Sequence, residues 1–139
     1  MSESSLESFN TKVITDFRAH EGRVGGNFEG APILLLHTSG ARTGAQRVNP
    51  MMYLEDAGRV YVFASKGGAH THPDWYHNLV AHPEVTVERG SETYQAVARP
   101  LDGSERERIY AIQAARYPGF GEYQAKTHRV IPVVELTRR

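Results

Sequence analysis

Histidines gather in one stretch of the chain, residues 65–82, which reads SKGGAHTHPDWYHNLVAH and contains His70, His72, His77 and His82. Imidazole nitrogens bind transition metals when several of them converge on one point. The stretch offers a single carboxylate partner, Asp74, and its spacing matches neither HExxH nor the His/Cys set of the zinc deaminases. The residue types therefore favour the prediction that no metal site lies here.

A short helix explains the same stretch without a metal. Pro73 suits the first position of a helix, where its missing N–H is no loss, and Thr71 or His72 would be the N-cap. The helix would run to about residue 82, with Trp75 and Leu79 packed on the rest of the domain. The two later histidines would then face solvent or lie at the helix end.

Two polar segments have compositions that suit ligand binding. The SKGG segment, 65–68, follows an expected strand, and its glycines would let a ligand approach the backbone closely. An ordinary flexible loop has the same composition. TSGARTGAQR, 38–47, combines a glycine-rich turn with Arg42 and Arg47, which suits an anion such as phosphate or carboxylate. A solvated hairpin turn is the alternative there, and neither segment is a Walker loop or a GxGxxG fingerprint.

The composition restricts what the chain can be. Its 139 residues suffice for one domain, and its 16 basic and 16 acidic side chains leave no overall basic field for nucleic acid. No cysteine is present, which excludes disulfides and cysteine-ligated metals and fits a reducing cytoplasm. The first residues lack an apolar run, so we expect no signal peptide, and no stretch approaches the ~20 apolar residues of a membrane span.

The apolar pattern predicts a small antiparallel β-barrel, mainly β with peripheral helices. A continuous apolar run at 32–38 predicts a strand covered on both sides, and turn signals at 56–58 and 90–91 predict hairpins. Pro132 suggests a sheet edge or a bulge in the last strand. The expected strands cover residues 32–38, 47–55, 59–65, 84–90, 93–100 and 130–136.

Helices are expected at the periphery. In residues 5–18, apolar side chains recur at helical spacing, as in a helix docked on the domain or a loosely held arm: Leu6, Phe9, Val13 and Phe17. Residues 104–117 predict a helix with Ser104 as N-cap and Glu107 completing a capping box, and a short helix follows at 120–126. We assign residues 1–30 to the N-terminal helix and a glycine-rich loop, and residues 31–139 to the barrel domain.

The blocks TSGARTG, RVNPMMYL, SKGG, PDWYHNL, YPGF and RVIPVVEL occur in this order between residues 30 and 138. Together they resemble the deazaflavin-dependent nitroreductase family of actinobacteria. The resemblance implies a split β-barrel related to flavin-binding barrels. It also implies binding of coenzyme F420, an 8-hydroxy-5-deazaflavin that carries a phosphate and a glutamate tail. The deazaflavin would deliver a hydride from its C5, while the protein supplies binding and orientation.

The resemblance further implies roles for particular residues. The basic turn would bind the phosphate and tail, the SKGG segment would contact the ring, and the helix after Pro73 would close the ring pocket. Tyr117 and Tyr123 would shape the substrate side, and these two, Ser65 or solvent would deliver the proton. The residues implied in cofactor binding are Arg42, Thr43, Arg47, Asn49, Ser65, Lys66, Gly67, Gly68, Pro73, Trp75 and Asn78.

The expected function is that of an F420-dependent oxidoreductase, which transfers a hydride from the reduced deazaflavin to an electron-poor acceptor. Quinones, activated C=C bonds and nitroaromatics are the candidate acceptors. Two alternatives stay open: a protein that stores the deazaflavin without turnover, and a split barrel that uses FMN or haem. We expect a cytoplasmic protein without a nucleic-acid partner. A contact with the inner face of the membrane and a homodimer are both left open.

Overall fold

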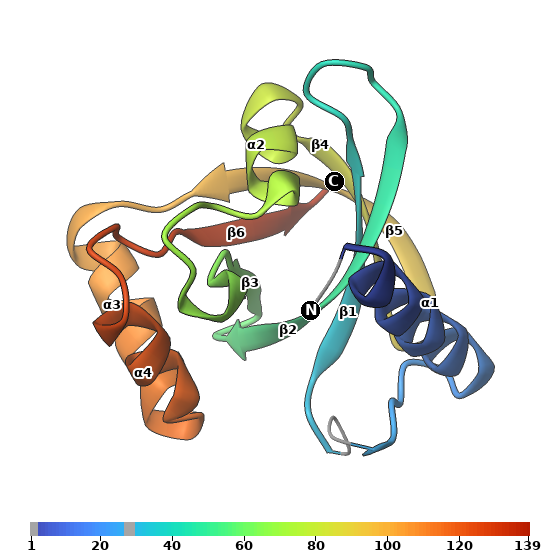
Figure 1. Cartoon of the computed structure of the whole chain (residues 1–139). Helices are drawn as coiled ribbons and strands as arrows, with labels where there is room; N and C mark the ends of the chain where they lie inside the picture. The colour runs from blue at the N-terminus through green and yellow to red at the C-terminus, as the bar shows by residue number, and fades with distance from the viewer. Residues whose placement is uncertain (1–2, 27–29) are drawn as a thin grey trace.

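The chain folds around a closed β-barrel in which neighbouring strands are antiparallel (Figure 1). The computed structural model describes residues 3–26 and 30–139, with side chains from residue 9 onward. The order around the barrel is β1-β2-β3-β6-β5-β4, which confirms the predicted antiparallel barrel. The strands are β1 (Ile33–Ser39), β2 (Gln46–Asp56), β3 (Arg59–Phe63), β4 (Glu84–Arg89), β5 (Glu92–Pro100) and β6 (Val133–Arg138).

Two tight turns join neighbouring strands as hairpins, as predicted. Between β2 and β3, Ala57 and Gly58 have φ values of 52° and 79°, as in a type I′ turn, whose twist matches that of paired strands. Gly90, with φ of 61°, begins the turn between β4 and β5. A Cβ on Gly22 would lie 2.7 Å from the Cα of Gly90, so the loop after the N-terminal helix approaches this hairpin only because Gly22 lacks a side chain.

Strands β1 and β3 bury apolar side chains on both of their faces. Strand β1 sends Leu34 and Leu36 into the barrel, while Ile33 and Leu35 pack outward, which confirms the strand covered on both sides. Strand β3 divides its side chains in the same way, and the second set meets the helices outside the barrel: Val60 and Val62 inward, Tyr61 and Phe63 outward. Period-2 alternation thus supplies two separate apolar clusters from one strand.

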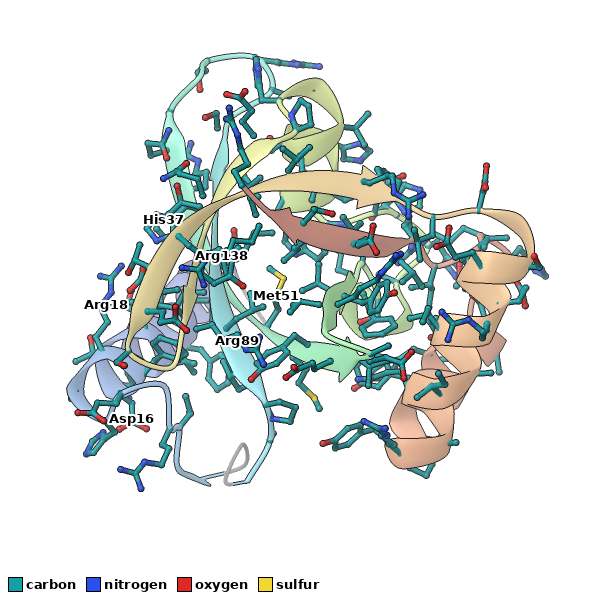
Figure 2. The ribbon with its side chains drawn as sticks, turned by 180° about the vertical axis from the view of Figure 1, so that it is seen from behind. Asp16, Arg18, His37, Met51, Arg89 and Arg138 are labelled. Carbon is teal, nitrogen blue, oxygen red and sulfur yellow. The ribbon has the colours of Figure 1, made fainter. Side chains whose placement is uncertain are left out.

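The N-terminal helix α1 (Glu3–Ala19) is docked on the barrel and is not a loose arm. Val13 and Phe17 are buried against the outward side chains of β1. Arg18 reaches Glu88 on β4, and His37 meets the same carboxylate. Figure 2 labels Arg18 on α1 and His37 on β1. The side chain of Leu6, also expected on the apolar face, lies outside the described residues.

Three further helices lie beside the barrel (Figure 1). Helix α2 (Asp74–Ala81) packs Leu79 and Trp75 against the cluster inside the barrel, as predicted. Helices α3 (Gly103–Arg116) and α4 (Gly119–Ala125) cover the outward side chains of β2 and β3, and α4 confirms the short helix expected near 120–126. None of the described helices is long and apolar enough to cross a membrane.

Both predicted helix starts were wrong by one or two residues. Pro73 has an extended backbone with ψ of 154°, so it is the N-cap of α2, and neither Thr71 nor His72 caps that helix. Helix α3 begins after Asp102, which places Ser104 inside the first turn and removes the predicted capping box with Glu107. Neither helix start has a side-chain cap hydrogen bond, so the backbone geometry of the preceding loop decides where each helix begins.

The prediction of a sheet edge or bulge at Pro132 was also wrong. Strand β6 begins one residue later and pairs with β3 on one side and β5 on the other. The carbonyl of Pro132 accepts a hydrogen bond from Ala64 at 3.0 Å. Pro132 therefore enters a central strand without removing a donor from the regular ladder.

Candidate functional site

The backbone after β3 turns sharply through left-handed conformations. Lys66, Gly67 and Gly68 have φ values of 47°, 64° and 85° and form a short 3-10 turn, η2 (Lys66–Gly68). A Cβ on Gly67 would meet no atom within 4 Å, whereas one on Gly68 would lie 2.9 Å from the carbonyl oxygen of Tyr123 on α4. Gly67 therefore offers open space to a ligand, and Gly68 instead lets α4 approach the turn.

Arg129 holds this turn from one side. Its guanidinium donates hydrogen bonds to the carbonyls of Ala69 at 2.8 Å, Ala64 at 3.1 Å and Ser65 at 2.8 Å. Burial lowers the pKa of Arg129, yet a guanidinium stays protonated in proteins. Sequence reasoning missed this residue because its partners lie 57 to 65 positions away, and only its place in the RVIPVVEL block drew attention to it.

His72 is a neutral hydrogen-bond acceptor at the edge of the turn. A guanidinium nitrogen of Arg129 lies 2.9 Å from Nδ1 of His72, and because that nitrogen can only donate, we assign the imidazole proton to Nε2. Burial lowers the pKa of His72, and the charges of Arg129 and His77 lower it further. His70 lies 3.2 Å from the hydroxyl of Thr127. Among the described residues, no group of three His, Asp or Glu side chains is placed to hold a metal ion.

Asn78 connects α2 to the hairpin between β1 and β2. Its side-chain amide donates to the hydroxyl of Thr38 at 3.2 Å and accepts from the backbone N–H of Ala41 at 3.0 Å. Asn78 is buried, and both hydrogen bonds reach the same hairpin. Its side chain therefore fixes the glycine-rich turn relative to α2.

The glycine-rich turn carries two arginines with free guanidinium groups. The turn is closed by hydrogen bonds from Gly40 to Ala45 at 2.7 Å and from Gly44 to Gly40 at 2.8 Å. The side chains of Arg42 and Arg47 are exposed and make no hydrogen bond or ion pair within the described part of the chain. Two free guanidinium groups on a fixed turn form an anion-binding surface.

The other polar residues of this hairpin differ in what they can offer. The hydroxyl of Thr43 accepts a hydrogen bond from the backbone N–H of Ala45 at 3.2 Å, within the turn itself. Asn49 is half-buried on β2 opposite Leu36. Alternation along β2 places Arg47 and Asn49 on the same face as Met51, which packs on the inner cluster. Arg47 therefore extends from the inner face of the barrel.

Helix α4 is fastened by polar contacts. The Tyr110 hydroxyl donates to the Phe120 carbonyl at 2.5 Å, and Gln124 accepts from Arg106 at 2.7 Å while donating to the Arg129 carbonyl at 2.7 Å. Tyr123 is half-buried, and its ring packs edge-on against Phe120. These hydrogen bonds fix α4 in place and so hold the backbone of Tyr123 beside η2.

The predicted site segments form one connected surface. Asn78 joins the glycine-rich turn to α2, the rings of Tyr76 and His77 on α2 contact His72, and Arg129 joins His72 to η2. Pro73 and Trp75 lie on the α2 part of this path. Tyr117 and Tyr123 are both partly buried and pack against the apolar cluster outside the barrel.

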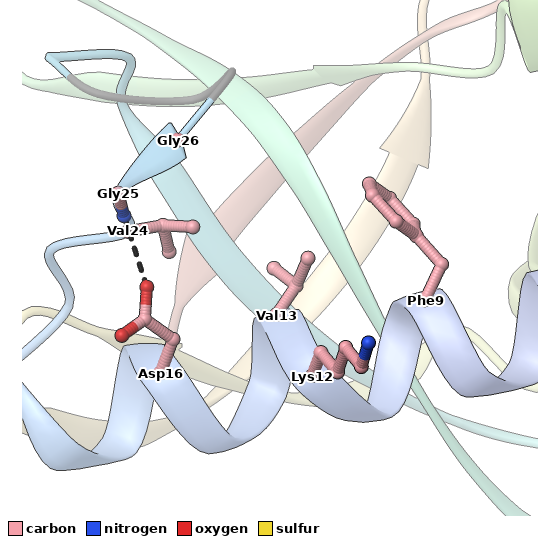
Figure 3. A pocket seen from close by; sticks show the side chains of 7 residues that line it. All are labelled: Phe9, Lys12, Val13, Asp16, Val24, Gly25 and Gly26. Carbon is pink, nitrogen blue, oxygen red and sulfur yellow. Dashed lines mark hydrogen bonds between the residues drawn. The ribbon is translucent and has the colours of Figure 1, made fainter.

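A shallow hollow of about 270 Å³ lies elsewhere, between α1 and the loop that follows it (Figure 3). Asp16 accepts a hydrogen bond from the backbone N–H of Gly25 at 2.9 Å on one side of it. The lining residues are Phe9, Lys12, Val13, Asp16, Val24, Gly25 and Gly26. None of the predicted site residues lines this hollow.

The closed antiparallel barrel with its peripheral helices places the chain in the split-barrel fold class. More specifically, the chain belongs to the F420H(2)-dependent quinone reductase family, whose sequence model matches residues 10–138. An F420H(2)-dependent quinone reductase of Mycobacterium tuberculosis is 40% identical over 130 residues, which are 88% of this chain and 85% of the relative.

Solved structures agree with this assignment. An F420-H2 dependent reductase, FDR-A, is 42% identical with a TM-score of 0.69, covering 76% of this chain and 93% of the other. A protein described as a domain-swapped dimer is 36% identical with a TM-score of 0.71, covering 97% and 99%. The predicted F420-dependent oxidoreductase is confirmed at the level of the family, and its cofactor is F420.

The residues present fit an elongated anionic cofactor. Open space in front of Gly67 suits a flat ring, and the free guanidinium groups of Arg42 and Arg47 suit phosphate and carboxylates. Helix α2 spans the distance between these two surfaces.

Proposed function

We propose that this chain uses reduced F420 to reduce a quinone, with the ring held along Ser65–Gly67 and the anionic tail on Arg42 and Arg47. The observation that carries the proposal is that these two arginines have no protein partner in the described residues, while their turn is fixed by Asn78. A preorganised cationic surface binds an anion without first breaking an internal ion pair.

Bound F420 supplies the hydride of the reaction. The chain orients its ring through the backbone of η2 and excludes water from it with α2 and α4. Tyr123 offers a hydroxyl to the oxygen of a quinone carbonyl as that oxygen gains charge, and the approach of its backbone to Gly68 of η2 supports this role. Tyr117 and Ser65 are the further candidates for proton delivery.

Quinones are favoured among the acceptor classes by the name of the family, with activated alkenes and nitroaromatics as alternatives of the same electron-poor character. The chain acts in the cytoplasm in this proposal. A homodimer is supported by the neighbour described as a domain-swapped dimer. Contact of the chain with the inner face of a membrane stays a prediction.

The test is a titration of the purified protein with F420, with a ring fragment that lacks the phosphate and tail, and with FMN. Because a charge-assisted contact contributes about 1.5–3 kcal/mol, Arg47→Ala should weaken F420 binding roughly tenfold to a hundredfold. The ring fragment should bind as it does to the wild type. Arg116→Ala is the matched control, since it removes an exposed arginine at the end of α3 that has no ion pair among the described residues.

Turnover separates the remaining alternatives. Tight FMN binding without F420 binding would contradict the proposal, and F420 binding without quinone reduction would support storage. Tyr123→Phe should keep the F420 affinity and lower kcat/KM for the quinone, because it removes one donor and keeps the ring. Wild-type rates of reduced-cofactor oxidation in both Tyr117→Phe and Tyr123→Phe would assign proton delivery to Ser65 or water.

A further inference from the structure

Arg129 is a charged residue whose hydrogen bonds converge on the segment that faces the ring. It donates to the carbonyls of Ala64, Ser65 and Ala69 and to Nδ1 of His72. No carboxylate lies within ion-pair distance of it among the described residues. The protein therefore binds this guanidinium through backbone carbonyls, and a purely structural arginine in this chain, such as Arg89, is paired with an acid instead.

We propose that Arg129 is the positioning residue of this segment: by drawing its carbonyls to one side, it aims the backbone N–H groups of Ser65 and Lys66 at the cofactor ring. The inference rests on the proposed function. It assigns the ring contact to amide donors of the backbone and makes their direction depend on a side chain from the other end of the sequence.

The geometry of the peptide unit carries the argument. In a trans peptide the C=O and the following N–H lie in one plane and point in opposite directions. Because the carbonyls of Ala64 and Ser65 point at Arg129, the N–H groups of Ser65 and Lys66 point away from it. Neither N–H group, nor that of Gly67, donates a hydrogen bond within the described part of the chain. The donors thus point away from Arg129, and the neighbouring Gly67 leaves open space around its own Cα.

Such donors match the ring that the proposed function places there. A deazaflavin has two carbonyl oxygens on its pyrimidine ring, and these accept hydrogen bonds. Amides held in place before binding stabilise charge on such acceptors without reorganising when the ring changes its redox state. Lys66 contributes its backbone, since its ammonium group is directed to the hydroxyl of Thr71 at 3.2 Å.

Hydrogen bonds also connect the backbone of Arg129 to α4, the helix that carries Tyr123. Gln124 donates to the carbonyl of Arg129 at 2.7 Å, and the N–H of Arg129 donates to Thr127 at 3.3 Å. Gln124 follows Tyr123 directly on α4. The backbone that carries Arg129 is therefore fixed relative to the tyrosine expected to meet the acceptor.

The test compares Arg129→Gln with two other variants. Arg129→Lys keeps the charge and loses the planar fork that reaches several carbonyls. Arg89→Gln is the matched control, because Arg89 is also partly buried and pairs with Glu55 at the end of β4 away from η2. The thermal midpoint of each variant is measured first, so that a general loss of stability is visible.

Two measurements then decide the inference. A lysine-specific protease reports opening of the segment without cofactor, since the chain's lysines are Lys12, Lys66 and Lys126. Arg129→Gln should speed cleavage after Lys66 about tenfold relative to Lys12, because removal of these hydrogen bonds raises the population of locally open states. Binding of the ring fragment, measured by fluorescence titration, should weaken about tenfold, and Arg129→Lys should recover only part of it.

Several results of these measurements would contradict the inference about Arg129. Unchanged cleavage after Lys66, wild-type affinity of Arg129→Gln for the ring fragment, or wild-type behaviour of Arg129→Lys would each overturn the inference. Equal effects in Arg89→Gln would also overturn it, since they would mean general destabilisation. If the wild-type protein binds neither F420 nor the fragment, the proposed function fails, and the protease result alone then shows whether Arg129 holds the segment.

Discussion

Two glutamines near α4 should respond in opposite ways to the same substitution. Gln113 on α3 is completely buried, and neither its amide nitrogen nor its amide oxygen has a hydrogen-bond partner within the described residues. Gln124 on α4 uses both atoms: it donates to the Arg129 carbonyl at 2.7 Å and accepts from Arg106 at 2.7 Å and from the Ile131 N–H at 3.0 Å. Methionine has a similar length and shape and lacks the polar atoms.

The sign of the change in the free energy of unfolding depends on whether the substitution leaves polar groups unpaired. Gln113→Met removes a buried polar group without partners and should raise the free energy of unfolding by about 1–3 kcal/mol. Gln124→Met leaves a guanidinium N–H, a backbone N–H and a carbonyl unpaired, and should lower it by about 2–4 kcal/mol. For a domain of this size the thermal midpoint should rise by about 3–10 °C in the first variant.

Thermal and urea unfolding of both variants, followed by circular dichroism, measure these changes. The denaturant slope should stay constant, so that a shift of the midpoint reports stability. A loss of stability in Gln113→Met would refute the reasoning, because it would show that the buried amide has a partner, such as an internal water molecule. A neutral Gln124→Met would mean that its hydrogen bonds do not fasten the segment at 129–131.

Two further predictions concern the turn and its histidine. Gly67→Ala should cost about 1 kcal/mol of stability, from its φ of 64°, while weakening F420 binding. Gly68→Ala should cost more and displace α4, since its Cβ would lie 2.9 Å from the Tyr123 carbonyl oxygen; equal unfolding free energies of the two variants would contradict this. The pKa of His72 is lowered in the folded chain, so the folded chain binds a proton less readily than the unfolded chain. The contribution of neutral His72 to stability is therefore complete above the ordinary histidine pKa of about 6.5 and is lost as the pH falls below that value. His72→Gln should flatten the change in unfolding free energy between pH 7.5 and pH 5.5, and an unchanged slope would show that His72 does not titrate differently on folding.

The barrel could be predicted from the sequence because its strands and turns are local. The apolar run of β1 and the Ala57-Gly58 turn each determine their structure within a few residues. The site was predicted through family resemblance and only in part through residue chemistry. The sequence does not distinguish the two neighbouring glycines, although Gly67 faces open space and Gly68 faces α4. Arg129 could not be found, because its role exists only when residues 57 to 65 positions apart meet.

Charge balance illustrates how a neutral chain can present a cationic surface. The acids and bases are equal in number, so composition predicts no overall field. In the fold, eight of the acids form ion pairs with arginines that lie away from the glycine-rich turn. These acids are Glu55, Asp56, Glu84, Glu88, Glu92, Glu105, Glu107 and Glu135.

That pairing leaves five arginines without a carboxylate among the described residues: Arg23, Arg42, Arg47, Arg116 and Arg129. Asp74 and Glu122 are unpaired acids on α2 and α4, so the surface is cationic at the turn and at the segment behind η2 and not over its whole length. In the proposed binding mode, the anionic tail of the cofactor meets the turn, and the hydrogen-bond acceptors of its ring meet the segment that Arg129 holds. The arginines that we propose to bind the ligand are therefore among those that the acids leave unpaired, which a count of charges does not show.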